Sequence, residues 1–364
     1  MYVKNLELNN YRNYDYLSIS FDKGTNILYG DNAQGKTNIL EAIYLSATTR
    51  SYKGTNDKDI IKFGNDQAHI KTGMFKDDID RLIDIHLRAG KTKVIAIDRE
   101  KIKKAAELMG LLNVVCFSPE DLDIIKDGPQ YRRKFVDMEL CQLDEFYIYN
   151  LTNYNKILEQ RNKLLKDIYF NPTLKDTVDI WDSQLESYGS KIIERRSQFV
   201  DQLNEIIKDI HSRLSGGKEE ITIIYEPNVD KDSINKMLKE NQARDMKSKS
   251  TSVGPHRDDF VFMVNGVDIR KFGSQGQQRT AALSLKLAEI EIVKKIIKDV
   301  PVLLLDDVLP ELDSKRQNFL LNEIKDIQTI ITCTGLDDFV NNRFEINKTF
   351  KVTEGKVELV ENKL

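Results

Sequence analysis

The chain is poor in the residues that build disulfide frameworks and metal sites. It has three cysteines in 364 residues, Cys116, Cys141 and Cys333, an odd number at distant positions. This pattern fits neither a disulfide framework nor a zinc site, and it favours unreactive thiols in a reducing compartment. The four histidines also lack metal-ligand spacing along the chain. The sequence by itself therefore gives no sign of a transition-metal centre.

Long apolar runs are missing as well. No stretch approaches the roughly 18 apolar residues that a membrane span requires. The first residues show no basic segment followed by an apolar one, so we expect a cytoplasmic protein rather than a secreted one. The net charge of −3 argues against a wholly basic surface that coats nucleic acid, and it leaves room for local basic patches.

What the chain does have is a phosphate-binding pattern near its N-terminus. The pattern is G-x-x-x-x-G-K-[ST], formed by Gly30, Asp31, Asn32, Ala33, Gln34, Gly35, Lys36 and Thr37. The two glycines let the loop curl so that backbone N–H groups point at phosphate oxygens, and the helix that follows adds its dipole. Lys36 reaches the β- and γ-phosphates, and Thr37 ligates Mg²⁺. We therefore predict binding of a nucleoside triphosphate with Mg²⁺.

A second part of this site is predicted near the C-terminus. Residues 301–305 are apolar, are typical of a strand buried on both faces, and lead into Asp306 and Asp307. Two carboxylates at such a place are costly unless a cation or a water meets them. We predict that Asp306 lies on the Mg²⁺ side with Thr37, and that Asp307 orients or deprotonates the attacking water. Because one Mg²⁺ joins the two segments, the strand of Asp306 is expected beside the strand that leads into Gly30.

The rest of the chain divides into a strand-rich first part and a helical middle. A basic and aromatic turn at residues 10–14 holds Arg12, which either reaches a bound nucleotide or is an exposed loop arginine. Apolar residues on a 4-3 spacing predict an antiparallel helical hairpin, with arms of roughly 25 to 35 residues and an aromatic stripe in its core. Strands are predicted at residues 1–8, 17–21, 67–75, 81–88, 92–98, 114–117 and 220–225.

A third motif narrows the choice among phosphate-loop proteins. Ser274, Gln275, Gly276 and Gln277 precede an apolar helix, where a serine hydroxyl and backbone N–H groups can grip a γ-phosphate. Alone, this stretch is better explained as a capped helix after a turn. With Gln278 and Arg279 it resembles the ABC-type signature, with glutamine in place of the first of two glycines. The resemblance implies a two-fold dimer in which residues 274–277 of one subunit meet the ATP held by the other.

Three further stretches resemble the RecF family of bacterial DNA replication and repair ATPases. They are residues 10–14, residues 119–137 with their Pro-Glu-Asp and Arg-Arg-Lys-Phe-Val-Asp runs, and the Gly-Pro-His-Arg-Asp-Asp run at 254–259. The resemblance implies a cytoplasmic protein that dimerises on ATP, binds single-stranded, gapped or junction DNA, and hydrolyses ATP slowly. It also implies work with RecR and RecO to load RecA, and support of the SOS response.

Three positions depart from the pattern of that family. Asp127 stands where glycine is more usual, which affects only a loop. The D-loop reads Pro310, Glu311, Leu312, Asp313; proline removes a hydroxyl and a backbone donor, while Asp313 remains. The strand at residues 329–334 offers no switch histidine, so Thr332 would be a weak γ-phosphate sensor suited to slow hydrolysis.

DNA contact is expected from basic patches, since lysine and arginine serve phosphate contact with little base readout. The candidates are Arg132, Arg133, Arg161, Lys163, Arg195 and Arg196. Two other classes compete with a DNA clamp. The motor subunit of an ABC transporter would normally have a switch histidine, and a small-molecule kinase would have no use for the motif at 274–279.

The expected fold is α/β: an ABC-type phosphate-loop ATPase head, similar to Rad50 and SMC heads but without a long coiled coil, and a helical second lobe. The predicted domains are residues 1–119 with 296–364 for the ATP-binding lobe, and residues 120–295 for the helical lobe that carries the signature.

Overall fold

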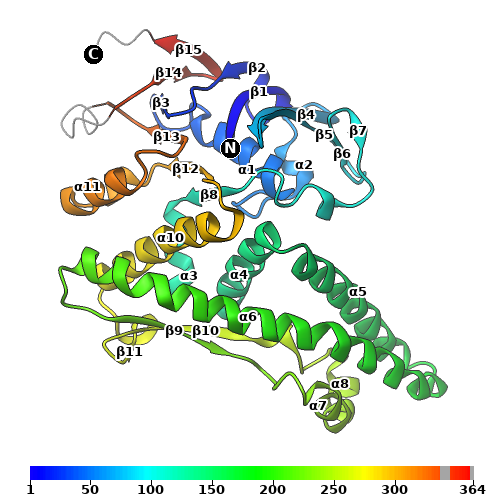
Figure 1. The fold of residues 1–364 in the computed structure, drawn as a ribbon. Helices are drawn as coiled ribbons and strands as arrows, with labels where there is room; N and C mark the ends of the chain where they lie inside the picture. The colour runs from blue at the N-terminus through cyan, green and yellow to red at the C-terminus, as the bar shows by residue number, and fades with distance from the viewer. Residues whose placement is uncertain (337–344, 361–364) are drawn as a thin grey trace. The chain divides into compact units, whose positions relative to one another are not determined.

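The computed structural model describes residues 1–336 and 345–360 (Figure 1). The chain forms two compact units, Met1–Asp121 with Glu289–Leu364, and Leu122–Ala288. The chain passes from the first unit to the second after Asp121 and returns inside helix α10 (Gln275–Ile297). Within the described residues, no helix has both the length and the apolar character that crossing a membrane requires.

The first unit contains a largely parallel sheet that carries the phosphate loop. Its strand order is β15-β14-β3-β13-β12-β8, and only the β14–β15 pair is antiparallel. Strand β13 therefore lies between β3 and β12, so the predicted contact between the strands of Gly30 and Asp306 was wrong. The strands are β3 (Thr25–Tyr29), β8 (Val114–Phe117), β12 (Val302–Asp306), β13 (Thr329–Cys333), β14 (Lys348–Thr353) and β15 (Lys356–Val360).

A second, antiparallel sheet in this unit has the order β2-β1-β4-β5-β6-β7. Its first two strands run further than predicted, and the turn that joins them is reduced to Arg12 and Asn13. Tyr11 and Tyr14 pair across the hairpin and are buried, so packing overrides the weak strand preference of the asparagines before them. The strands are β1 (Tyr2–Tyr11), β2 (Tyr14–Ser20), β4 (Gln67–Lys76), β5 (Ile79–Arg88), β6 (Val94–Ile97) and β7 (Glu100–Lys101).

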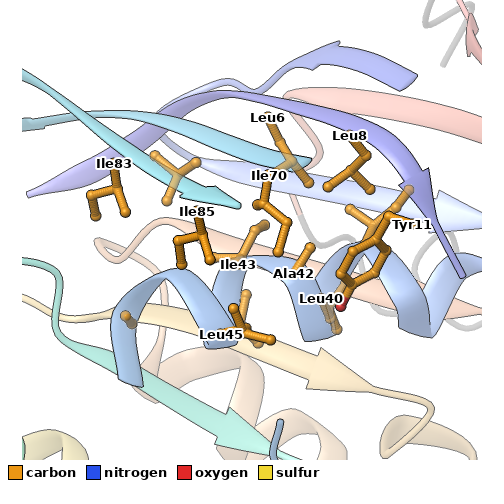
Figure 2. Close-up of a cluster of buried hydrophobic side chains, with 14 of the residues drawn as sticks. Leu6, Leu8, Tyr11, Leu40, Ala42, Ile43, Leu45, Ile70, Ile83 and Ile85 are labelled. Carbon is orange, nitrogen blue, oxygen red and sulfur yellow. The ribbon is translucent and has the colours of Figure 1, made fainter. Parts of the chain in front are cut away.

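Helix α1 (Lys36–Thr48) follows the phosphate loop and contacts strands of both sheets. Figure 2 shows its apolar residues beneath the inner face of β1, β4 and β5. This core fixes the loop at the start of α1, because the helix cannot shift without opening cavities that cost about 2–5 kcal/mol per lost large side chain. The residues labelled there are Leu6, Leu8, Tyr11, Leu40, Ala42, Ile43, Leu45, Ile70, Ile83 and Ile85, all of which are buried.

The second unit is built on a helical hairpin whose arms are unequal. Helix α5 (Glu145–Asp167) has 23 residues and α6 (Val178–Ser215) has 38, or about 35 and 57 Å at 1.5 Å per residue. The longer arm exceeds the prediction because α6 packs against α5, α7 (Ile234–Glu240) and β9 (Ile221–Glu226) in turn. Tyr147 and Tyr154 of the predicted aromatic stripe are buried, as expected of core residues.

A three-stranded sheet and shorter helices complete the second unit. The sheet has the order β11-β10-β9, and its central strand β10 was not predicted. The remaining elements are α3 (Leu122–Lys126), α4 (Pro129–Leu143), α8 (Gln242–Ser248), β10 (Asp259–Val264), β11 (Val267–Asp268) and α9 (Ile269–Phe272).

Candidate nucleotide-binding site

The phosphate loop joins β3 to α1 through backbone conformations that close a concave turn. Gly30, Ala33 and Gly35 have positive φ angles of 152°, 64° and 111°. A Cβ atom on Gly30 would lie 2.3 Å from the Val352 carbonyl oxygen, and one on Gly35 would lie 2.5 Å from the Asn13 side chain. The space is therefore available only to glycine, and the curl it permits turns backbone N–H groups toward one anion site.

Lys36 closes the loop from inside. Its side chain is 3% exposed, and its ammonium donates to the carbonyl oxygens of Gly30 at 2.7 Å and Asp31 at 2.8 Å. The positive charge is thereby held against the concave side of the loop. This is the place in which a lysine neutralises phosphate charge in proteins with this loop.

The β1–β2 hairpin supports the loop from the neighbouring sheet. The Asn13 amide donates to the Gln34 carbonyl at 3.0 Å and accepts from the Asn38 amide at 2.8 Å. The Tyr14 hydroxyl donates to the Gly35 carbonyl at 3.1 Å. Tyr14 is buried, so its hydroxyl supports the loop from a fixed position, while Asn13 is exposed.

Arg12 is neither an exposed loop arginine nor aimed at the loop. Its Nε and Nη2 donate to both oxygens of the buried Glu41 carboxylate at 2.8 and 2.6 Å. Further N–H groups donate to the Thr55 hydroxyl and the Asp59 carbonyl. Burial alone would raise the pKa of Glu41, but the hydrogen bonds from Arg12 and Ser51 bring that pKa below its usual value. Arg12 thus anchors α1, and its contact with a nucleotide stays a prediction.

Asp306 is the meeting point of three hydroxyl groups. One oxygen accepts from Thr37 at 2.8 Å and from Thr332 at 2.9 Å, and the other accepts from Tyr52 at 2.7 Å. The sequence placed Thr37 and Asp306 together, and the structure does so across the intervening strand β13, which contributes Thr332. Tyr52 was missed, because it lies in a polar segment after α1 without a motif of its own.

Asp307 follows in a strained conformation. Its φ angle is 51°, and its backbone N–H donates to the Thr332 hydroxyl at 2.9 Å. Burial raises the pKa of its carboxyl group, with Lys36 acting in the opposite direction. Its Oδ1 is buried and accepts no hydrogen bond from the residues that the structure describes. Buried acceptors without partners are rare, and they cluster where a water or ligand belongs.

This set of donors fits Mg²⁺ and a nucleoside triphosphate. Mg²⁺ prefers hard oxygen ligands, which the Thr37 hydroxyl and the Asp306 carboxylate provide. The glycine-lined loop and Lys36 suit a polyphosphate, and the free acceptor of Asp307 suits a water. The geometry can therefore support attack of water on a phosphoryl group.

The signature residues form a capped and exposed helix start in the second unit. The Ser274 hydroxyl accepts from the Gln277 N–H at 3.2 Å, and the Gln277 side chain accepts from the Ser274 N–H at 2.9 Å. Ser274, Gln275 and Gly276 are exposed, and the preceding Phe272 is 76% exposed. The helix start is thus built as the alternative explanation predicted, and its exposure also leaves it accessible to a partner.

The D-loop aspartate caps a helix. Pro310 lies in a short 3-10 turn (Leu309–Glu311), and Asp313 caps helix α11 (Ser314–Glu323). The Asp313 carboxylate accepts from the Arg316 N–H at 2.9 Å and pairs with the Arg316 guanidinium at 2.9 Å. Both of its oxygens therefore have partners within the same unit.

Three of the arginines predicted to bind DNA are buried, and these predictions were wrong. Arg161 is fully buried and pairs with Asp182 at 2.5 Å and Asp245 at 2.8 Å. A guanidinium enclosed by carboxylates cannot reach a DNA phosphate, since leaving its partners would strand buried charges.

The same argument excludes Arg196 and Arg132 as DNA contacts. Arg196 pairs with Asp137 at 2.7 Å and Asp258 at 2.8 Å, and Arg132 pairs with Asp259 at 2.6 Å. Much of the Gly-Pro-His-Arg-Asp-Asp run thus serves to pair the arginines of α4 and α6. The remaining candidates are the exposed Lys163 and the half-buried Arg133 and Arg195, the last of which pairs with Asp144.

Known proteins resemble this chain over its whole length. Residues 2–358 match the family described as the RecF/RecN/SMC N terminal domain. A protein of Agathobacter rectalis named DNA replication and repair protein RecF is 59% identical over 361 residues, covering 99% of this chain and 100% of that protein. One of the same name from Lachnospira eligens is 58% identical over 359 residues, covering 98% and 99%.

Solved structures agree with this relationship. The structure of the recombination mediator protein RecF-ATP in the RecFOR pathway is 36% identical, covers 99% of this chain and 98% of that chain, and has a TM-score of 0.93. The Smc head domain of Pyrococcus furiosus, 17% identical with a TM-score of 0.57 over 99% and 96% of the chains, shares the fold. The expected ABC-type ATPase head fold is confirmed, and the chain belongs to the RecF family.

Proposed function

We propose that this protein is an ATP-switched DNA-binding protein of replication and recombinational repair, which closes as a dimer on ATP and opens on hydrolysis. The observation that carries the proposal is the cluster of Thr37, Asp306 and Asp307 beside the phosphate loop, together with an exposed signature at Ser274 in the other unit. A solved RecF-ATP structure that covers 98% of its own chain supports the choice of ATP.

Hydrolysis is assigned to the residues around Asp306. Thr37 and Asp306 would hold Mg²⁺, which would supply positive charge near the phosphate oxygens. Lys36 would bind the same phosphates, and Asp307 would accept the proton of the attacking water. Its raised pKa favours that role, since a base works best when its pKa approaches the operating pH. Turnover is expected to be slow, because the Thr332 hydroxyl already donates to Asp306 and accepts the Asp307 N–H, which makes it a weak sensor of the γ-phosphate.

The dimer is proposed to place residues 274–277 of one subunit on the ATP of its partner. The exposed Ser274 hydroxyl and the N-terminus of α10 supply donors for a γ-phosphate. Asp313 is proposed as the D-loop residue of the same interface. Arg12 is proposed as a further nucleotide contact. Four of its five N–H groups donate to Glu41, Thr55 and Asp59, and the fifth would face the nucleotide.

The nucleic acid is proposed to be single-stranded, gapped or junction DNA, with Arg133, Lys163 and Arg195 as phosphate contacts. RecR and RecO are the proposed protein partners in loading RecA and supporting the SOS response. The cytoplasm is the proposed compartment. The similar solved RecF-ATP structure is that of a recombination mediator protein in the RecFOR pathway, which supports these partners.

Light scattering with gel filtration tests the dimer. We expect a monomer without nucleotide and a dimer with ATP and Mg²⁺, and a longer-lived dimer for Asp307→Asn, in which hydrolysis is blocked. Lys36→Arg should retain ATP binding better than hydrolysis. If the Asp307→Asn variant bound ATP but stayed monomeric, the proposed dimer would be wrong.

A matched pair of variants tests the signature. Ser274→Arg should abolish the dimer while leaving ATP binding by the isolated subunit intact. Ser197→Arg, at an exposed serine on α6 of the same unit, is the control and should dimerise normally. Only variants that dimerise should retain gapped DNA in the presence of ATP. DNA binding that is the same with and without ATP in all variants would contradict the switch. Phosphorylation of a metabolite without dimerisation would favour the kinase alternative.

A further inference from the structure

Two histidines and an aspartate meet on the antiparallel sheet of the first unit, away from the phosphate loop. His69 lies on β4, and Asp84 and His86 lie on β5. The hairpin register places His69 directly opposite His86, and Asp84 precedes His86 by two residues on the same face of β5. A sequence separation of 17 residues hides this proximity, which depends on strand pairing.

The register that brings these residues together is firmly specified. The β4–β5 turn consists of Asp77 and Asp78, both with positive φ, as tight two-residue hairpins require. The opposite face of these strands carries the buried residues Ile70, Ile83 and Ile85, which pack over α1 (Figure 2). A slip of one residue would exchange the two faces and place histidines in the core.

The side chains converge on one carboxylate oxygen. The Nε2 atom of His69 contacts Asp84 Oδ1 closely, and the Nε2 atom of His86 lies 3.1 Å from the same oxygen. The two imidazole rings are stacked, with centroids 3.9 Å apart and planes 15° from parallel. One ligand atom from each of the three residues lies within 4.8 Å of the others.

The spacing suits a small divalent ion. Around a tetrahedral ion with bonds of about 2.0 Å, neighbouring donor atoms lie about 3.3 Å apart. The separation of 3.1 Å between His86 and Asp84 is already close to that value. The side chains of His69 and Asp84 are 22% and 16% exposed and that of His86 is 46% exposed, so the cluster is half-buried and open on the His86 side. Water can therefore complete the coordination.

The donor types select the class of ion. Imidazole nitrogen favours borderline transition metals such as Zn²⁺, while Mg²⁺ and Ca²⁺ prefer sites made of oxygen alone. Nearby charges weaken the site without cancelling it. Lys71 is next on β4 on the same face, and its ammonium lies 3.9 Å from the Glu7 carboxylate, which offsets it. Arg88 is a further cation near His86.

We propose that His69, Asp84 and His86 bind one divalent transition-metal ion, with Zn²⁺ as the chief candidate and water as the remaining ligand. The site is separate from the Mg²⁺ site at Thr37 and Asp306, and it does not depend on the proposed ATPase cycle. A bound ion would cross-link β4 to β5 and stabilise the sheet that supports the phosphate loop, since any ligand of the native state stabilises it by mass action.

Titration of the full chain with ZnCl₂ alone, followed by calorimetry and thermal unfolding, tests the proposal. We expect one saturable site and a rise in melting temperature with Zn²⁺ concentration. Asp84→Asn and His86→Asn should each weaken Zn²⁺ binding by roughly tenfold or more, at least as much as the loss of a residue that only orients a metal ligand. His86→Asn is the variant most compatible with folding, because its side chain is the most exposed of the three.

Asp80→Asn is the matched control. Asp80 lies on the same strand, is mostly exposed, and pairs with Lys4 instead of the cluster, so its loss should leave Zn²⁺ binding unchanged. Co²⁺ in place of Zn²⁺ should give the visible absorption of a nitrogen and oxygen site. The proposal is overturned by the absence of a saturable site, by unchanged affinity in folded Asp84→Asn and His86→Asn, or by a thiolate-to-Co²⁺ band, which would place the ion on a cysteine.

Discussion

The Thr332 hydroxyl lies 2.9 Å from the Asp306 carboxylate and donates to it, while it accepts the backbone N–H of Asp307 at 2.9 Å. One side chain from β13 thus holds both acidic residues at the end of β12. This bond couples the orientation of the proposed Mg²⁺ carboxylate to that of the proposed base.

Thr332→Ala is expected to slow ATP hydrolysis by roughly tenfold or more while changing ATP affinity much less, as for other losses of a positioning partner. The Asp307 N–H would lose its acceptor, which also costs about 1–2 kcal/mol of folding free energy. Turnover and the lifetime of the ATP dimer are the measurements. Thr332→Ser keeps the hydroxyl and should behave nearly as wild type. Unchanged turnover and dimer lifetime in Thr332→Ala would refute the coupling.

Tyr52→Phe removes one of the three hydroxyl groups bonded to Asp306 and keeps the ring that packs on Tyr44. We expect a several-fold increase in the Mg²⁺ concentration needed for half-maximal hydrolysis, because the carboxylate is less firmly oriented. Tyr16→Phe changes an exposed tyrosine of the same unit and should leave the Mg²⁺ requirement unchanged. An identical Mg²⁺ titration for Tyr52→Phe and wild type would show that Tyr52 has no part in the site.

Arg161→Met should reduce the free energy of unfolding by about 3–5 kcal/mol, because it leaves Asp182 and Asp245 as unpaired buried carboxylates. Urea unfolding measures this change. Lys163→Met, two residues away and exposed, should leave stability unchanged and weaken DNA binding in a salt-dependent manner. If Arg161→Met were fully stable and bound DNA poorly, the assignment of Arg161 to the core would fail.

The stability of the second unit should fall as the pH drops below about 6.5, and His256 contributes to this fall. Burial lowers the pKa of His256 to about 4, and its ring nitrogens lie 2.7 Å from the Tyr154 hydroxyl and 3.0 Å from the Thr251 carbonyl. Between pH 6.5 and 4 the unfolded chain binds a proton that the folded chain excludes. Unfolding is therefore favoured by up to about 1.4 kcal/mol per pH unit, or about 3 kcal/mol over the window.

His256→Gln tests this contribution through the slope of stability against pH. The variant loses hydrogen bonds and should be less stable at pH 7, but its stability should depend less on pH between 6.5 and 4.5 than that of wild type. Urea midpoints at several pH values measure both. Equal slopes for the two proteins would mean that His256 titrates alike in the folded and unfolded states.

Several features of this protein follow from the sequence alone because their causes are local. The phosphate loop needs glycine at positions 30 and 35 and a lysine and threonine after them, and those residues are contiguous. The apolar run before Asp306 and the 4-3 spacing of the hairpin are also local patterns, and both elements are present. Even the proximity of Thr37 to Asp306 was predictable, since one ion imposes it.

Other features depend on which strands and helices become neighbours, and only the tertiary structure decided them. Strand β13 lies between β3 and β12 and places Thr332 next to Asp306. Tyr52, which also bonds Asp306, belongs to a segment without a motif. Arg161 and Arg196 appeared as basic patches, yet carboxylates from distant segments surround them.

His69 and His86 show the same limit most clearly. They have no metal-ligand spacing along the chain, and the β4–β5 register stacks their rings beside Asp84. Burial, pairing and register arise from packing between remote segments, whose free energies no single stretch of residues contains. The sequence therefore determined that a nucleotide loop and its acidic strand exist, and the fold decided which side chains orient them and which charges remain exposed.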